Sequence, residues 1–295
     1  MSDFRLKVFQ SVAKNLSFTK ASQELFVSQP AITKHIQELE ATYQTRLFDR
    51  QGSKISLTES GRLLLEHCER ILEDYKRLEY EMHLLHNEYI GELKLGASTT
   101  IAQYVLPPLL GSFIGKFPQV NLSLLNGNSR EIEAALQEHR IDLGLVEGVF
   151  RLPNLKYTTF LEDELVAVVH SKSRLQLPEE ITSQDLPAIP LVLRERGSGT
   201  LDVIERSLQK HGVKLASLHV LMYLGSTESI KLFLENSDCM GIVSIRSICK
   251  ELAAGTFRVV EIKDMPMLRD FCFVQLQGQE GGLSQAFMNY MFMSR

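Results

Sequence analysis

The chain has 295 residues, too many for one ordinary hydrophobic core, which predicts two or three compact units. Hydrophobic residues make up 44% of it and charged residues 23%, a composition that excludes extensive disorder. The N-terminus lacks the apolar core of a leader sequence and no apolar run is long enough to cross a bilayer, so we expect a cytoplasmic protein without membrane contact. The four cysteines lack metal-ligand spacing, so we expect no metal site and no disulfides, only free and buried thiols.

The net charge of −4 is unevenly distributed along the chain. Residues 1–58 hold eight basic and five acidic side chains and so carry +3, which leaves −7 for the remainder. A locally basic segment attached to an acidic body is typical of a protein whose head faces nucleic acid.

The first sixty residues predict three short helices followed by a pair of strands. Ser17 can cap the second helix and Ser28 the third, where Pro30 occupies the first turn and sacrifices no intrahelical hydrogen bond. Apolar residues recur at helical spacing in the first helix (Phe4, Val8, Phe9, Val12) and in the third (Ile32, Ile36, Leu39). Two short helices joined by a tight turn indicate a helix-turn-helix, whose second member enters the major groove of DNA.

The exposed face of that third helix supplies side chains that suit base edges and phosphates. The residues that we expect there are Ser28, Gln29, Pro30, Thr33, Lys34 and Gln37. Beyond it, residues 47–57 predict two strands about a Gln-Gly turn, a wing that would direct Arg50 and Lys54 at the backbone or minor groove.

A long helix is predicted from Thr58 to about Asn87. Apolar residues repeat in it at heptad spacing, which indicates a coiled-coil seam between two chains. The seam residues are Leu64, Cys68, Ile71, Tyr75, Leu78, Met82 and Leu85. The alternative is a helix that packs on its own regulatory domain.

From residue 90 onward, strands and helices alternate, which predicts an α/β domain with a largely parallel sheet. One set covers residues 92–146, with a helix over 100–117, and a second covers 165–245. The chain then returns to the first set with a strand at 271–276 and a helix from Leu283.

Two strand-to-helix junctions, Gly96–Thr100 and Arg194–Thr200, carry glycines and hydroxyls of the kind that bind anions at helix N-termini. We expect a small oxyanion or carboxylate there, with Arg194 or Arg196 assisting; ordinary helix capping is the alternative. Glu147 is left out, because an unpaired carboxylate would oppose an anion. The expected effector contacts are Ser98, Thr99, Thr100, Ser198, Thr200 and Ser226.

The N-terminal segment resembles the LysR-type transcriptional regulators. The matching residues lie in register over some sixty positions: Phe9, Ser17-Phe18-Thr19, Ala21, Leu25, Val27–Thr33, Ile36, Leu39-Glu40, Leu47-Phe48, Arg50, Leu57-Thr58 and Gly61. The resemblance implies that Gln29, Pro30, Thr33, Lys34 and Arg50 contact DNA, that the body has a two-lobed periplasmic-binding-protein-like fold, and that dimers pair into tetramers. One departure is Gln44, where the family usually has a glycine and a left-handed backbone would strain glutamine.

The sequence therefore predicts an α/β protein with an N-terminal all-α winged helix-turn-helix (1–58), a linker helix (59–89) and an effector domain (90–295). Its lobes would comprise about 90–162 with 266–295, and about 163–265. The expected partners are double-stranded DNA, a small-molecule effector, further copies of the chain as homodimer and homotetramer, and RNA polymerase, with no cofactor. Within the family, the junctions Gly96–Thr100 and Arg194–Thr200 resemble those of regulators of cysteine biosynthesis and of sulfur or carbon assimilation, which implies sulfite or sulfate as the effector. The alternative is a dimeric small-molecule-binding protein or an enzyme that does not bind DNA.

Overall fold

The computed structural model describes residues 4–51, 54–84, 89–278 and 281–293. Contacts between Cα atoms divide the chain into two compact units, residues 1–88 and 89–295, so that the long linker helix belongs to the first unit. Within the described ranges, no helix combines the length and the apolar character needed to cross a membrane.

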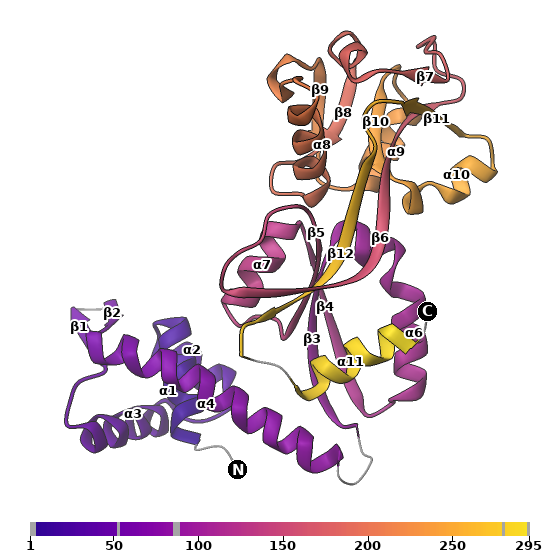
Figure 1. The fold of residues 1–295 in the computed structure, drawn as a ribbon. Helices are drawn as coiled ribbons and strands as arrows, with labels where there is room; N and C mark the ends of the chain where they lie inside the picture. The colour runs from indigo at the N-terminus through magenta and orange to yellow at the C-terminus, as the bar shows by residue number, and fades with distance from the viewer. Residues whose placement is uncertain (1–3, 52–53, 85–88, 279–280, 294–295) are drawn as a thin grey trace. The chain divides into compact units, whose positions relative to one another are not determined.

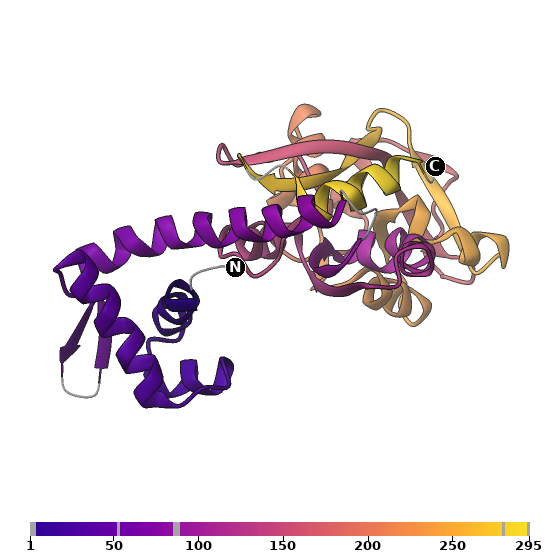
Figure 2. The ribbon, with the colours of Figure 1, turned by 90° about the horizontal axis from the view of Figure 1, so that it is seen from below.

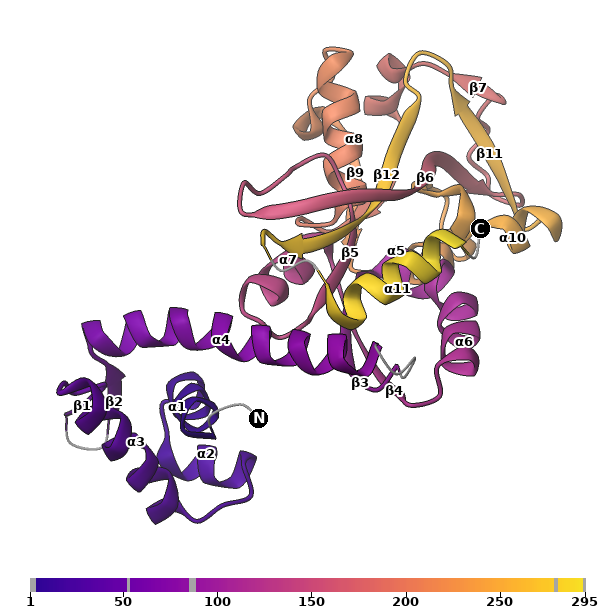
Figure 3. The ribbon, with the colours of Figure 1, turned by 60° about the horizontal axis from the view of Figure 1, so that its bottom comes forward.

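The first unit opens with three helices and a two-stranded wing (Figure 3). The elements are α1 (Phe4–Asn15), α2 (Phe18–Glu24), α3 (Gln29–Tyr43), β1 (Phe48–Gln51) and β2 (Lys54–Leu57). One apolar core joins the three helices to the wing, with Phe9, Ile32 and Leu47 among its buried members. The predicted helix-turn-helix and wing are confirmed.

Helix α4 (Glu59–Leu84) is uninterrupted, and its first half packs into this same core (Figure 2). Cys68 is fully buried and donates through Sγ to the carbonyl oxygen of Leu6 at 3.3 Å, and Leu72 is buried nearby. The prediction that Cys68 contributes to a seam between two chains is therefore wrong, because the helical turn that carries it is covered by α1 of its own unit.

The second unit contains two lobes that share one sheet (Figure 1). Lobe I comprises β3 (Gly91–Ser98), α5 (Thr99–Tyr104), α6 (Leu106–Lys116), β4 (Val120–Gly127), α7 (Ser129–Gln137), β5 (Leu143–Glu147) and α11 (Gly282–Met293). Lobe II comprises β7 (Glu180–Ile181), β8 (Leu191–Arg194), α8 (Gly199–Lys210), β9 (Val220–Leu224), α9 (Thr227–Glu235), β10 (Met240–Ser244), α10 (Cys249–Ala253) and β11 (Phe257–Ile262), with short 3₁₀ turns at Ser183–Ala188, Leu215–Ser217 and Ile245–Ser247. Strands β6 (Leu155–His170) and β12 (Met267–Leu276) run through both lobes.

The sheet is mixed rather than largely parallel. Its order is β4-β3-β5-β12-β6-β10-β8-β9, with β11 pairing β6 and β7 pairing β11. Pairs within each lobe are mostly parallel, as in β3 with β4 and β8 with β9, but β6 and β12 run antiparallel to each other and to their other neighbours. The expectation failed because the two crossing strands pair at long range, which local alternation does not reveal.

Helices cover both faces of the sheet in each lobe. In lobe I, α6 and α11 pack on one face through Phe113 and Phe287, whereas α7 packs on the other through Ile132. In lobe II, α8 and α9 take the corresponding places through Ile204 and Ile230. The expected helix at 100–117 is instead two helices that break at Val105, just before the prolines at 107 and 108.

Gly61 is the tightest packing point between α4 and the wing. A Cβ atom placed there would lie 2.1 Å from the carbonyl oxygen of Leu47, which is backbone and cannot move aside.

We expect Gly61→Ala to lower the free energy of unfolding of the full chain by about 1–3 kcal/mol, as overpacking does. Urea denaturation measures it. In the control Gly111→Ala, where the added methyl meets open space within a helix, stability should rise by about 1 kcal/mol; equal effects of the two changes would contradict this packing.

The cysteines differ in accessibility, which corrects the expectation that all four thiols are buried. Cys68, Cys239 and Cys272 are buried, and burial raises the pKa of each, that of Cys68 to about 12, whereas Cys249 is exposed. A raised pKa leaves little thiolate at mildly alkaline pH.

We expect a chromogenic disulfide reagent to titrate one thiol per chain rapidly and the other three only in denaturant. Cys249→Ala should abolish the rapid phase, and a rapid phase that survives it would contradict the burial pattern.

Candidate functional site

The helix-turn-helix is fixed by the two caps that the sequence predicted. The hydroxyl of Ser17 accepts from the amide of Lys20 at 3.2 Å, and that of Ser28 accepts from the amide of Ala31 at 3.4 Å. Pro30 occupies the first turn of α3. The start of the recognition helix is therefore defined by local hydrogen bonds and by a residue whose φ is already helical.

The outer face of α3 presents most of the predicted DNA contacts to solvent. Thr33 is half-buried, and its hydroxyl donates to the carbonyl of Gln29 at 3.1 Å while accepting from the Gln29 side chain at 3.3 Å. Exposed residues on this face are Ser28, Gln29, Pro30, Lys34 and Gln37. Arg50 and Lys54 lie on the wing strands, but their side chains fall outside what the structure describes.

The turn after α3 has the left-handed backbone expected at the position of the family's glycine. Gln44 adopts φ 50° and ψ 35°, and its amide donates to the carbonyl of Glu40. The Glu40 carboxylate also accepts from the amide of Leu47 at 2.8 Å. This one acidic side chain thus holds the chain that leads from α3 into the wing, which accommodates a non-glycine residue in the turn.

Along α4, the predicted seam divides into a buried and an exposed part. Leu64 and Tyr75 are half-buried, whereas Ile71, Leu78 and Met82 are 40%, 52% and 53% exposed. Leu85 lies outside the described residues. These three exposed seam residues all lie after Cys68, along the second half of the helix.

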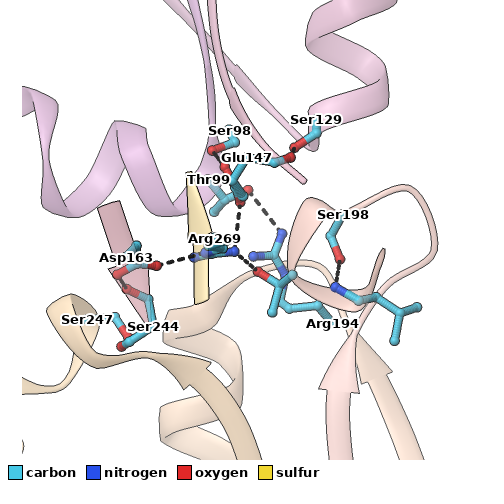
Figure 4. A network of polar contacts seen from close by, with 12 residues as sticks. Ser98, Thr99, Ser129, Glu147, Asp163, Arg194, Ser198, Ser244, Ser247 and Arg269 are labelled. Atoms are coloured by element: carbon cyan, nitrogen blue, oxygen red, sulfur yellow. Dashed lines mark hydrogen bonds and ion pairs between the residues drawn. The ribbon is translucent and has the colours of Figure 1, made fainter. Parts of the chain in front are cut away.

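In the regulatory unit, the ends of strands from both lobes bring Ser98 and Thr99 close to Glu147, Arg194 and Arg269 (Figure 4). Ser98 ends β3, is fully buried and donates to the carboxylate of Glu147 at the end of β5. It makes no capping bond to α5, which argues against the capping alternative at this position. Thr99 donates to the carbonyl of Gly127 at 3.2 Å and accepts from Nη2 of Arg194 in lobe II at 3.3 Å.

Arg269 joins the lobes where the two crossing strands meet. Its Nε donates to Oδ2 of Asp163 at 2.7 Å, and Asp163 is its register partner across the β6–β12 pair. Nη1 donates to Oγ1 of Thr200 at 2.9 Å and lies 3.6 Å from Oε1 of Glu147. These contacts connect the strand pair to α8 of lobe II and to β5 of lobe I.

Arg194, at the end of β8, is the second buried guanidinium. It is 1% exposed and forms a two-pronged ion pair with Glu195, Nε to Oε2 at 2.8 Å and Nη2 to Oε1 at 3.0 Å. The sequence predicted that Arg194 or Arg196 assists anion binding. The structure places Arg194 in the network, whereas Arg196 is exposed.

Three buried polar atoms, on the two arginines and on the residue after Thr99, have no hydrogen-bond partner within the described part of the chain. They are Oγ1 of Thr100 in lobe I, Nη1 of Arg194 in lobe II and Nη2 of Arg269 on the crossing strand. A buried donor without a partner is costly, and most such groups in proteins are satisfied. All three can donate a hydrogen bond to an acceptor, and two of them are positively charged.

Two predicted contacts have helix-capping roles instead. Ser198 donates to the carbonyl of Glu195 at 2.8 Å and accepts from the amide of Leu201 at 3.2 Å, so its hydroxyl is occupied at the start of α8. Ser226 caps α9 by accepting from the amide of Ser229 at 3.1 Å. The hydroxyl of Ser226 also contacts that of Ser229, so both interactions stay within α9 and its cap.

Sequence reasoning missed Arg269 and Asp163 and set Glu147 aside. A signal for the first two was present, because alternation along strand 267–276 places Arg269 on the side of Met267 and Phe271 rather than toward solvent. A charged residue at an inward position of an apolar strand indicates a buried ion pair or a binding site. Glu147 is not the unpaired carboxylate that was assumed, since Ser98 and Arg269 both contact it.

A second polar cluster joins the lobes beside this network. The hydroxyl of Tyr104, at the end of α5, donates to Glu228 on α9. The same carboxylate accepts from Nζ of Lys231 at 2.8 Å, and Lys231 also contacts Glu251 at 2.5 Å. Burial raises the pKa of Tyr104, and its hydroxyl therefore stays protonated as a donor.

Comparison with known proteins agrees with both units. Residues 4–62 match the model for the bacterial regulatory helix-turn-helix protein of the lysR family, and residues 86–292 match the LysR substrate binding domain. The uncharacterized HTH-type transcriptional regulator YeiE of Escherichia coli (strain K12) is 34% identical over 258 residues, which cover 88% of this chain and 85% of YeiE.

The solved structures that resemble this one include a regulatory domain and a full-length protein bound to DNA. The CcmR regulatory domain of Synechocystis PCC6803, in complex with 2-PG, is 28% identical with a TM-score of 0.62, and the match covers 69% of this chain and 97% of that domain. Full-length CbnR complexed with its target DNA matches over the whole of both chains with a TM-score of 0.62 and 23% identity, which shows the shared fold.

A helix-turn-helix with its wing is thus followed by a two-lobed regulatory domain that carries a polar network between the lobes. Family models match both parts, and together they span more than half of the chain. The chain belongs to the LysR family of bacterial transcriptional regulators, with an N-terminal helix-turn-helix and a regulatory domain of the effector-binding type.

Proposed function

We propose that this regulator responds to a small anion bound between its two lobes. The observation that carries the proposal is a set of three buried donors, on Thr100, Arg194 and Arg269, that have no partner among the described residues. Arg194 of lobe II and Arg269 of the shared strand belong to the contact network, and Thr100 of lobe I directly follows Thr99, which Arg194 contacts. An oxyanion or carboxylate could accept from all three and would thereby favour the arrangement in which the lobes meet.

The chemistry of the donors favours an anion over a neutral ligand. Guanidinium groups form shorter and stronger hydrogen bonds with oxyanions than neutral hydroxyls do. The site therefore uses charge-assisted bonds, with Thr100 as the neutral donor, in place of the neutral hydrogen bonds that the hydroxyl-rich junctions suggested. Sulfite, sulfate and small carboxylates are the effector candidates. The complex of the related CcmR regulatory domain with 2-PG supports a small-molecule ligand for this kind of domain.

The DNA-binding role is assigned to the outer face of α3 and to the wing. Gln29, Thr33 and Lys34 would read base edges or phosphates, and Arg50 and Lys54 would contact the backbone or minor groove. The structure of CbnR with its target DNA supports a duplex as the partner.

Because DNA and RNA polymerase are cytoplasmic in bacteria, we assign the protein to the cytoplasm and propose contact with the polymerase.

A homodimer formed through the second half of α4 would present two heads to a pseudo-palindrome. Among the described side chains of this half, Ile71, Leu78 and Met82 are apolar and exposed. Pairing of such dimers into a tetramer would allow the effector to change the spacing of the heads, with a coupling of about 1–3 kcal/mol.

Substitution on α3 tests the DNA-binding role. Lys34→Ala and Gln29→Ala should each weaken binding of the full chain to its promoter fragment by about 1–3 kcal/mol per head, since a phosphate or base contact is lost. Fluorescence anisotropy with a labelled fragment measures this. Lys172→Ala removes an exposed lysine of the regulatory domain and should leave the affinity unchanged. Full-strength binding by both α3 variants would exclude this face as the DNA contact.

Thr100→Val tests the anion site with a change that removes only the unpaired hydroxyl. In the ligand-free protein it should raise the free energy of unfolding by about 1 kcal/mol, because a buried donor without a partner disappears. It should also weaken binding of the anion about tenfold, as one lost hydrogen bond does. Thermal unfolding and isothermal titration of the full chain with sulfite, sulfate, phosphate and glycolate measure the two effects.

Ser226→Ala is the control, because its hydroxyl caps α9. It should lower stability by about 1 kcal/mol and leave anion affinity unchanged. Absence of heat with every anion in the panel would reject a small anion as the effector, and the assignment to the family would be unaffected.

A further inference from the structure

Glu147 is held rigidly at the centre of the network. Its carboxylate accepts from Ser98 and lies 3.6 Å from Nη1 of Arg269, and its carbonyl oxygen accepts from Oγ of Ser129 at 2.7 Å. On the other side, Gly199 of lobe II approaches so closely that a Cβ there would lie 1.9 Å from the same carbonyl oxygen. Contacts from both lobes therefore fix the position of this buried carboxylate.

The buried network has more carboxylates than guanidinium groups, so it does not form a positively charged site. Two buried guanidinium groups belong to Arg194 and Arg269, and each already has a carboxylate partner, Glu195 and Asp163 respectively. Glu147 is a third carboxylate. Among the described residues, Arg246 is a further cation near Asp163, at 3.6 Å, and its side chain is 41% exposed and therefore reaches solvent. A fully deprotonated anion would thus be placed next to a negative charge in a medium of low dielectric constant, where repulsion is strong.

An anion that carries a hydrogen-bond donor would meet a different environment. Its O–H group can donate to the Glu147 carboxylate, which as an ionised group only accepts. Its remaining oxygens can accept from the unpaired donors of Thr100, Arg194 and Arg269. The carboxylate that repels a bare anion then stabilises one with a hydroxyl by a short, charge-assisted hydrogen bond.

We infer that Glu147 is the specificity residue of the effector site and selects anions that carry an O–H donor. The ligand class is partly protonated oxyanions and hydroxycarboxylates, whereas sulfate and simple carboxylates are rejected. The inference rests on the proposed anion site and narrows its candidates. The general rule is that a site built to accept a hydrogen bond from its ligand binds an analogue without that donor more weakly. The buried acceptor of the site is then left without its partner.

Titration of the full chain at neutral pH with two pairs of anions of similar size tests the selectivity. Phosphate carries a proton and sulfate does not, and glycolate carries a hydroxyl that acetate lacks. The wild-type chain should bind phosphate and glycolate at least about a hundredfold more tightly than sulfate and acetate. Isothermal titration calorimetry provides the dissociation constants.

The variant Glu147→Gln keeps the size of the side chain and its ability to accept from Ser98, but it removes the negative charge and adds an N–H donor. We expect it to bind sulfate and to prefer phosphate over sulfate by less than about tenfold. Glu195→Gln removes the same charge from the partner of Arg194. That variant should bind all four anions more tightly and keep the wild-type preference for phosphate over sulfate and for glycolate over acetate. The comparison separates a hydrogen bond from the ligand to Glu147 from a general effect of removing one negative charge.

Thermal unfolding verifies that both variants are folded. Equal affinity of the wild-type chain for phosphate and sulfate, or a preference that persists in Glu147→Gln, would overturn the role of Glu147 while leaving the anion site in place. If neither the wild-type chain nor either variant bound any of the four anions, the anion site itself would be rejected.

Discussion

The regulatory unit is organised by an ion pair between its two crossing strands. Arg269 and Asp163 are register partners on β12 and β6, and their side chains are buried where one lobe gives way to the other. A buried charge is tolerated only with a partner at close range, so the pairing fixes both the register of the strands and the direction of the guanidinium. The remaining nitrogens of Arg269 then face Thr200 and Glu147, which brings α8 and β5 to the same place.

The same arrangement explains why the site lies between the lobes. Parallel strands β3, β5 and β8 end there and lead into helices or loops, as ligand sites in α/β sheets require. The antiparallel pair passes through the middle and contributes charge. Glycine at position 199 lets the start of α8 approach Glu147 without a side chain in between. The site is thus a product of sheet topology and of one close backbone approach.

Features that depend on neighbouring residues could be predicted from the sequence. The caps at Ser17 and Ser28, the proline in the first turn of α3 and the strained turn at Gln44 are all local, and all are present. The hydroxyls at residues 98–100 and Thr200 were predicted as effector contacts because glycine-rich junctions mark strand ends. The place of Arg269 in the network was not predicted, because its partners Asp163 and Thr200 are 106 and 69 residues away in the chain. Cys68 was misassigned because heptad spacing cannot distinguish a surface shared by two chains from one covered within a single chain.

The burial of Cys68 and Leu72 has a mechanical meaning for the first unit. The first half of α4 shares one hydrophobic core with α1, α3 and the wing, so these elements are packed together as one unit. The second half continues the same helix without a break toward Leu84. A rotation of the second half of α4 about its axis would therefore be passed through this shared core to the recognition helix. Reorientation of two such helices would change how the paired heads meet successive grooves of the duplex.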